Sequence, residues 1–258
     1  MRKLVVLERE EEASLISLND EGSFNSLSED LLKELFAVLK EADKDHSTKV
    51  LILRGVGRGF SAGHNLKEVQ GNQDESFYRN LMACSKKVMT ILPNLNKPVI
   101  AEVHGVATAA GCQLVAACDL AYADTETKFA TPGVNIGLFC HTPLVSVSRT
   151  IAKKHSMEML LLGEMVEATE AKRFGLINDV FEPEELHERV MTVAKTISSK
   201  SSYILKLGKE TFYKQLNMSL EEAYEYASER MIKNLRAEDA KEGIDAFLNK
   251  RDPKWKNS

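Results

Sequence analysis

The stretch KPVIAEVHGVATAAGCQLVAACDLAYA, residues 97–123, contains the unit that decides the fold. Residues 97–103 hold a short apolar run, which is typical of a buried strand. Residues 109–118 are small and apolar and predict a helix, and residues 119–123 predict the next strand. Strand, helix and strand in succession predict an α/β layer with right-handed crossovers.

The sequence before this unit continues the alternation. Strands are predicted for residues 13–18 and 49–55, and a helix for residues 74–92. Residues 26–29 read as a capping box that opens a further helix. The apolar face of that helix consists of Leu31, Leu32, Leu35, Phe36 and Leu39.

From about residue 152 onward, the signals become helical only. Residues 219–222 cap one helix, and residues 242–248 belong to the last. We therefore expect an α/β core over residues 1–195 and a helical region over residues 196–258.

Composition limits the classes of protein that need to be considered. The chain has 258 residues, of which 43% are hydrophobic and 28% charged, and its net charge is −4. A globular chain of this length can build a core without disulfides or metals. The acidic balance gives no general attraction for nucleic acid or for an anionic membrane.

The cysteines and the N-terminal segment suggest a compartment. The four cysteines form no Cys-x-x-Cys pair, so we expect free thiols in a reducing environment. The apolar run in residues 4–7 is too short for a signal peptide, and we predict a cytoplasmic protein, although a removed organellar presequence would leave no trace. The uncharged residues 129–148 are broken by prolines and glycines and predict no membrane helix.

Two glycine-rich loops each follow a predicted strand. The first, GRGFSAGHNL at residues 57–66, has a tight backbone whose N–H groups could hold an anion or a polarised carbonyl, or could simply form a turn. The second, GVATAAGCQ at residues 105–113, opens a helix whose free N–H groups serve a ligand or only allow close packing. If each loop donates one N–H to the same oxygen, the two form an oxyanion hole.

With these loops, the sequence resembles the enoyl-CoA hydratase/isomerase (crotonase) superfamily over nearly its whole length. The motifs that carry the resemblance are residues 54–68, 97–101, 110–119, 129–137 and 158–177. The resemblance implies an α/β fold, a spiral core of ββα units with an α-helical C-terminal trimerisation region. It also implies a homotrimer or a dimer of trimers that binds acyl-CoA, with coenzyme A as part of the substrate and no other cofactor or metal.

The resemblance also assigns roles to particular residues. It implies that the backbone N–H groups of Ala62 and Ala110 hold the thioester oxygen. The residues implied to contact coenzyme A are Ser61, Ala62, His64, Asn65 and Leu66, with Lys250, Arg251 and Lys254 near its phosphates.

The chain departs from the family where the family's hydratases carry two glutamates. Gln113 and Gly133 occupy these positions, and neither residue exchanges a proton near neutral pH. A positioned acid or base contributes roughly 10²–10⁴-fold to a rate, so we expect weak or no hydratase activity. Without a side chain, Gly133 is expected to enlarge the cavity.

Other polar groups near the loops remain as candidates. His64 is a candidate for orienting a thioester or an acyl carboxylate, or it contacts coenzyme A. Cys140 and His141 are neighbours, which point to opposite sides of an extended segment, so we favour Cys140 as a wall residue over a catalytic pair. Glu102 and Asp119 are expected to be structural.

Three functions remain open at this stage. The first is an acyl-CoA-binding, hydratase-like enzyme, and the second is a decarboxylase of CoA esters that works by stabilising an enolate. The third is a non-catalytic acyl-CoA binder. A nucleic-acid-binding or membrane-inserted protein is disfavoured.

Overall fold

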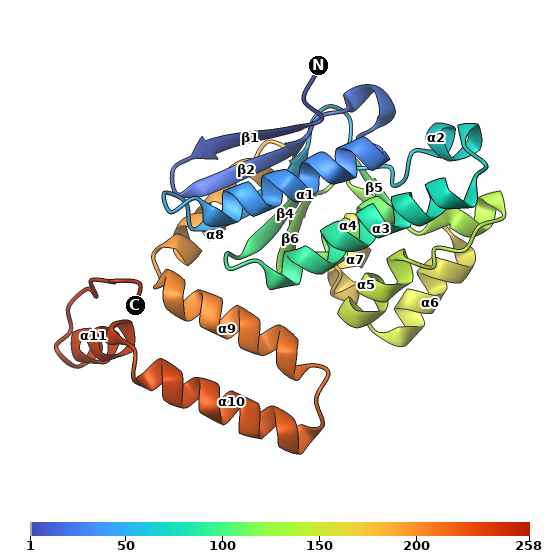
Figure 1. Ribbon diagram of the computed structural model, residues 1–258. Coiled ribbons are helices and arrows are strands. Elements are labelled where there is room, and N and C mark those ends of the chain that lie inside the picture. Colours follow the sequence, from blue (N-terminus) through green and yellow to red (C-terminus); the bar gives the residue numbers. More distant parts are fainter. Residues whose placement is uncertain (1) are drawn as a thin grey trace.

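A computed structural model describes residues 2–258, and its core is a mixed six-stranded sheet (Figure 1). The order across the sheet is β1, β2, β3, β4, β6 and β9. Only the first pair is antiparallel, and the remaining neighbours run parallel. The strands are β1 (Val5–Glu10), β2 (Ala13–Leu18), β3 (Val50–Gly55), β4 (Val99–Val103), β6 (Leu120–Asp124) and β9 (Asp179–Phe181).

Both faces of this sheet are buried because its strands are apolar on both sides. One face packs against α1 (Glu29–Lys44) and α3 (Glu75–Ile91), and the other packs against α8 (Leu186–Ser198). Leu51 and Leu53 point into the first layer, while Ile52 points into the second. A continuous apolar run is the pattern expected of such a parallel strand.

A second, smaller sheet positions the two loops. It consists of β5 (Val106–Thr108), β7 (Lys128–Ala130) and β8 (Val166–Glu167), in that order. Strand β5 also forms a parallel bridge to the first loop, between Ser61 and Ala107. The small sheet therefore ties the loop at residues 57–66 to the start of α4 (Ala110–Ala117).

Further helices surround this core and extend the chain. They are α2 (Leu66–Gly71), α5 (Pro143–Thr150), α6 (Lys153–Leu162), α7 (Ala168–Phe174), α9 (Ser202–Gln215), α10 (Leu220–Leu235) and α11 (Glu238–Leu248), with short 3-10 turns at Glu21–Ser23, Leu92–Asn94 and Pro132–Ile136. Figure 1 shows α9–α11 projecting from the core. Among residues 2–258, no helix is long and apolar enough to cross a membrane.

Several predicted elements are confirmed, and two predictions are wrong. The strand–helix–strand unit is present as β4, α4 and β6, and the helix expected from residue 74 is α3. The N-cap of α1 is Ser28, which accepts from the Leu31 N–H, so the capping box predicted from residue 26 is misplaced by two residues. The region after residue 152 is not purely helical, because β8 and β9 lie there as very short strands. The predicted boundary at residue 195 falls in the last turn of α8.

Candidate functional site

The N–H of Ala62 is not available to a ligand. It donates to the carbonyl oxygen of Phe24 at 3.0 Å, so the prediction that Ala62 supplies an oxyanion donor is wrong. The next free donor in the loop is the N–H of His64, which has no protein acceptor among the described residues. A two-residue shift along the loop was invisible in the sequence because the acceptor lies nearly forty positions away.

Gly63 brings this part of the loop against the start of α4. Its φ of +87° lies in the left-handed region that favours glycine. A Cβ atom at this position would lie 2.9 Å from the Thr108 oxygen and 3.0 Å from the nitrogen of Ala110. The backbone that carries the His64 N–H therefore lies directly beside the nitrogen of Ala110.

The start of α4 provides the second free backbone N–H of the site, that of Ala110. Ala109 adopts φ 50° and ψ −116°, an unusual conformation for a residue with a side chain, and its N–H donates to Ala130 O at 2.8 Å. Ala110 is the first helical residue, and its N–H has no protein acceptor among residues 2–258. Gly111 must lack a side chain, because a Cβ would lie 2.2 Å from Ser61 O. The two free amides, of His64 and Ala110, therefore meet where the loops touch.

The other predicted coenzyme A contacts of the first loop have different surroundings. Ser61 is fully buried, and its hydroxyl donates to Asn25 O at 2.8 Å, so the expectation that it touches coenzyme A is wrong. Asn65 caps α2 by accepting from the N–H groups of Lys67 and Glu68. Leu66 is 53% exposed and is free to contact a ligand.

Gln113 lies one turn into α4, close to the free amide of Ala110. It is only 4% exposed, and its Oε1 has no hydrogen-bond partner among residues 2–258. Because one helical turn rises about 5.4 Å, the amide group lies within reach of the acyl part of a thioester held at Ala110. Its amide can donate and accept hydrogen bonds, but it cannot exchange a proton near neutral pH.

Gly133 does not enlarge the cavity, in contrast to the prediction. A Cβ there would lie 3.1 Å from the Sγ of Cys140 and 3.1 Å from Leu138 O. The Cys140 side chain therefore fills the space beside Gly133. Cys140 is buried whereas His141 is exposed, which agrees with the expectation that they point to opposite sides. Burial raises the pKa of the Cys140 thiol, so it is not poised as a nucleophile.

His64 carries a second unusual group besides its main-chain amide. The Nε2 atom of its ring is buried and has no hydrogen-bond partner in the part of the chain that the structure describes. Burial lowers the pKa of His64 to about 4, because the charged imidazolium would lose its water. The ring is therefore neutral at physiological pH.

Asp119 fastens the C-terminal helices to the core. Its carboxylate accepts from Val99 N at 2.7 Å, from Lys209 Nζ at 2.6 Å and from Tyr213 Oη at 2.8 Å. Lys209 also donates to the carbonyl oxygens of Leu92 and Lys97, both at 2.9 Å. Burial, together with Asp119, raises the pKa of Tyr213. Sequence reasoning missed Lys209 and Tyr213, because nothing local distinguishes them from other residues of a helix.

Glu102 is also structural, as expected. It accepts from the ring of His187 at 2.9 Å, and the other ring nitrogen of His187 lies 3.2 Å from Glu10. Burial opposes protonation of this histidine, but the hydrogen bonds to the two glutamates outweigh it and raise its pKa. This cluster joins α8 to the sheet and lies outside the groove described below.

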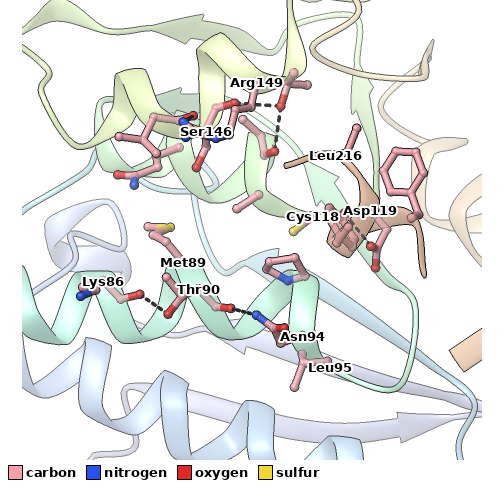
Figure 2. Close-up of a pocket in the computed structure, with 18 of the residues that line it drawn as sticks. Lys86, Met89, Thr90, Asn94, Leu95, Cys118, Asp119, Ser146, Arg149 and Leu216 are labelled. Atoms are coloured by element: carbon pink, nitrogen blue, oxygen red, sulfur yellow. Dashed lines mark hydrogen bonds between the residues drawn. The ribbon is translucent and has the colours of Figure 1, made fainter. Parts of the chain in front are cut away.

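A groove with a volume of about 1450 Å³ begins at Gln113 and opens between α3, α5 and α9. Figure 2 shows its walls, with Lys86 and Met89 from α3, Ser146 and Arg149 from α5, and Leu216 after α9. Residues 113, 116 and 117 lie on the same face of α4 and line its floor. The groove also includes Met82, Ser85, Val145, Lys206, Glu210, Phe212 and Lys214.

The C-terminal basic residues are only partly free. Arg251 pairs with Glu242 at 2.6 Å and with Asp245 at 2.5 Å, and the N–H of Lys254 donates to Glu242. Lys250 makes no ion pair among the described residues. Their contact with the phosphates of coenzyme A stays a prediction.

Comparison with known proteins places this geometry in a family. The model of the enoyl-CoA hydratase/isomerase family matches residues 8–258. Human enoyl-CoA hydratase domain-containing protein 3, mitochondrial, is 45% identical over 241 residues, 93% of this chain and 79% of that protein. The mitochondrial enoyl-CoA hydratase of Pongo abelii is 32% identical over 94% of this chain and 83% of that protein.

Solved structures agree with the sequence comparison. The crystal structure of human enoyl-CoA hydratase domain-containing protein 3 has a TM-score of 0.94 at 42% identity, covering 98% of this chain and 100% of that one. An enoyl-CoA hydratase from Mycobacterium smegmatis has a TM-score of 0.95 at 41% identity, with 98% of each chain covered. The sequence motifs favour the branch of the human protein, and the predicted fold, an α/β core with C-terminal helices, is confirmed.

Proposed function

This chain belongs to the enoyl-CoA hydratase/isomerase family, and from that premise we propose that it binds acyl-CoA thioesters and polarises their carbonyl without the usual hydratase carboxylates. The single observation that carries the proposal is the meeting of two unpaired main-chain amides, of His64 and Ala110, beside a groove. Such donors stabilise the negative oxygen that forms when a thioester becomes an enolate.

The proposed arrangement assigns a role to each part of the site. The thioester oxygen accepts from the N–H groups of His64 and Ala110, and the helix dipole of α4 adds to the positive potential there. The acyl group then extends past Gln113 into the groove. Leu66 and the exposed edge of the first loop contact coenzyme A, whose phosphates we place near Lys250 and Lys254.

Among the described residues, the groove contains no carboxylate that is free to act as an acid or a base. Its two carboxylates are Asp119, which is held by Lys209, and Glu210, which pairs with Lys214 and Arg230. Gln113 and the Gly133–Cys140 contact occupy the places where the family's hydratases carry glutamates. Since each positioned acid or base contributes roughly 10²–10⁴-fold, we expect hydration to be slower by about four orders of magnitude or more.

Calorimetric titration with butyryl-CoA, together with a spectrophotometric assay of crotonyl-CoA hydration, tests the proposal. We expect saturable binding with hydration near the background rate. Fast hydration that persists in Gln113→Ala would overturn the view that acid–base groups are missing. Absence of binding by the folded protein would overturn the thioester site itself.

Decarboxylation of a malonyl-type CoA ester is a second candidate, favoured by the unpartnered ring nitrogen of His64 beside one of the donor amides. Loss of carbon dioxide leaves an enolate, which an oxyanion hole stabilises without a glutamate pair. Release of carbon dioxide from methylmalonyl-CoA by wild type, reduced in His64→Ala, supports this reaction. Binding without turnover across thioesters supports the third alternative, a non-catalytic acyl-CoA binder.

We further propose that the C-terminal helices assemble the chain into a homotrimer or a dimer of trimers. Large apolar side chains on α9–α11 are strongly exposed in the single chain, with Leu220 at 76% and Phe247 at 83%. Surface of this kind on a soluble protein usually marks an interface. Light scattering on the purified chain measures its mass, and a monomer at micromolar concentration would contradict the proposal.

The subcellular compartment of this protein is also open to a direct test. The sequence favours the cytoplasm, whereas the human relative is named as mitochondrial. Imaging of the chain with a C-terminal tag decides between the two compartments.

A further inference from the structure

We propose that the groove accepts an acyl group that ends in a carboxylate, in preference to a plain hydrocarbon chain. This inference rests on the proposed function, because it concerns the acyl part of the same thioester. Its support is a set of positive charges that line the groove and form no ion pair among residues 2–258.

The inner end of the groove combines apolar walls with two polar groups. Gln113 Oε1 and Ser85 Oγ are buried atoms without a hydrogen-bond partner among residues 2–258, and both residues line the groove. Gln113 is 4% exposed and Ser85 is 1% exposed. Buried polar groups are nearly always hydrogen-bonded, so a polar group of the ligand or a water molecule is expected to complete them. Since an ionised carboxylate has no hydrogen to donate to Gln113 Oε1, the preference for a carboxylate rests on the charges at the rim.

The rim of the groove is positively charged. Lys86 on α3, Arg149 on α5 and Lys206 on α9 line it, and none forms an ion pair in the described part of the chain. Arg149 uses one guanidinium nitrogen for Val145 O at 3.0 Å, which leaves its other donors free. Figure 2 shows Lys86 and Arg149 on opposite walls.

The negative charges of the groove do not cancel this field. Asp119 is neutralised by Lys209 at 2.6 Å, and Glu210 lies between Lys214 and Arg230. Lys86, Arg149 and Lys206, on three different helices, therefore line one groove without a carboxylate partner among residues 2–258. An arginine with free donors binds a carboxylate through paired hydrogen bonds, which a methyl terminus cannot replace.

The dimensions of the groove fit a chain that reaches the rim. The hydroxyl of Thr150 donates to Ala116 O at 3.0 Å, so the end of α5 lies beside α4 less than two turns from Ala110. At 1.5 Å per residue, the six steps from residue 110 to residue 116 span about 9 Å. The volume of about 1450 Å³ also exceeds the roughly 300–1,000 Å³ of common ligand pockets.

Titration with adipyl-CoA and hexanoyl-CoA tests this inference, because the two acyl groups share their length and differ at the terminal carbon. We expect wild type to bind adipyl-CoA about tenfold more tightly at low salt. The double variant Lys86→Gln/Arg149→Gln should lower that preference to about twofold and leave hexanoyl-CoA unchanged. Lys195→Gln, which removes an exposed positive charge on α8 away from the groove, is the control and should retain the full preference.

A third variant addresses the inner end of the groove. Gln113→Met replaces the amide with an apolar side chain of similar length, and we expect it to strengthen hexanoyl-CoA binding severalfold, because the unsatisfied amide is gone. Unchanged hexanoyl-CoA binding in this variant would contradict the role given to the amide.

The remaining outcomes are also decisive. Equal binding of both esters by wild type would overturn the inference and leave the proposed function standing, whereas binding of neither ester would overturn both. If the double variant dissociates the oligomer but keeps the preference for adipyl-CoA, the cations face a second copy of the chain and the inference is wrong.

Discussion

The two halves of the candidate site are built from different parts of the chain. In the thioester half, the functional groups are main-chain amides of His64 and Ala110, which Gly63 and Gly111 bring together. In the groove half, the lining and its support depend on side chains, such as Gln113 in the wall and Lys209, which holds Asp119.

This difference accounts for what the chain keeps and what it lacks. A main-chain donor persists in any sequence that preserves the backbone shape. At residue 110, an alanine supplies the donor through its backbone N–H. A side-chain acid disappears with a single substitution, and we propose that such substitutions have occurred at residues 113 and 133. A family can therefore retain thioester binding while its members change the chemistry beside it.

The largest effect is expected where side chains hold the groove together. Lys209→Met leaves the partly buried Asp119 carboxylate without its cation, and we expect a loss of about 3 kcal/mol in the free energy of unfolding. Urea denaturation measures this loss. Lys214→Met removes an exposed cation from the same helix and should cost less than about 1 kcal/mol. Equal losses in the two variants would show that the Asp119 cluster does not hold α9.

The thioester half is expected to fail when its backbone contact is disturbed. Gly111→Ala places a Cβ 2.2 Å from Ser61 O, which forces α4 away from the first loop. We expect acyl-CoA affinity to fall about 10²-fold, which is about 2.7 kcal/mol, as measured by calorimetry. Gly208→Ala, also in a helix but with nothing within 4 Å, is the control and should bind normally. Normal binding by Gly111→Ala would mean that the two loops need not touch.

A gain of function tests the groove half. Gln113→Glu restores one ionisable carboxylate beside the thioester, and we expect crotonyl-CoA hydration to rise about 10²-fold above wild type. Initial rates at neutral pH measure this change, with Gln113→Met as the control that should show no gain. If hydration stays at the background rate in Gln113→Glu, the carboxylate missing at residue 133 is the limiting one.

The smallest effect concerns His64, whose ring is the titratable group nearest the donor amides. Because burial lowers its pKa from 6.5 to about 4, the unfolded chain binds the proton more readily between these values. Stability therefore falls as the pH falls through this window, by about 2 kcal/mol between pH 8 and pH 5.

Urea unfolding of wild type and His64→Gln at both pH values isolates this contribution. His187 has a raised pKa, so its stabilisation is present at low pH and lost as the pH rises, but it is common to both proteins and cancels in the comparison. An identical pH dependence of stability in the two proteins would show that folding does not lower the pKa of His64.

Much of the fold could be predicted because it follows from local patterns. The apolar runs at residues 50–53 and 99–101, and the small residues of α4, specify a strand–helix–strand order directly. The three-residue strands of the smaller sheet could not be predicted, since β5 and β7 exist only through their pairing with each other. The choice of Ser28 over Ser26 as the cap of α1 depends on which hydroxyl can reach the Leu31 N–H.

The candidate site was only partly predictable. The sequence alone indicated that two loops supply main-chain donors and that residues 113 and 133 lack carboxylates. It placed the first donor at Ala62, because nothing in the loop shows that Phe24 O takes that hydrogen bond. The sequence also predicted a larger cavity at Gly133. This was wrong because the position of Cys140 depends on how the segment after Gly133 folds back.

The sequence by itself determined the alternation of strands and helices in the core, the family resemblance and the identity of residues 113 and 133, since these depend on residue type and periodicity along the chain. Only the tertiary structure decided which amides stay free, which cavity is filled and which charges stay unpaired. These properties arise from hydrogen bonds and contacts between residues tens of positions apart, and the free energy of such pairs depends on distance in space.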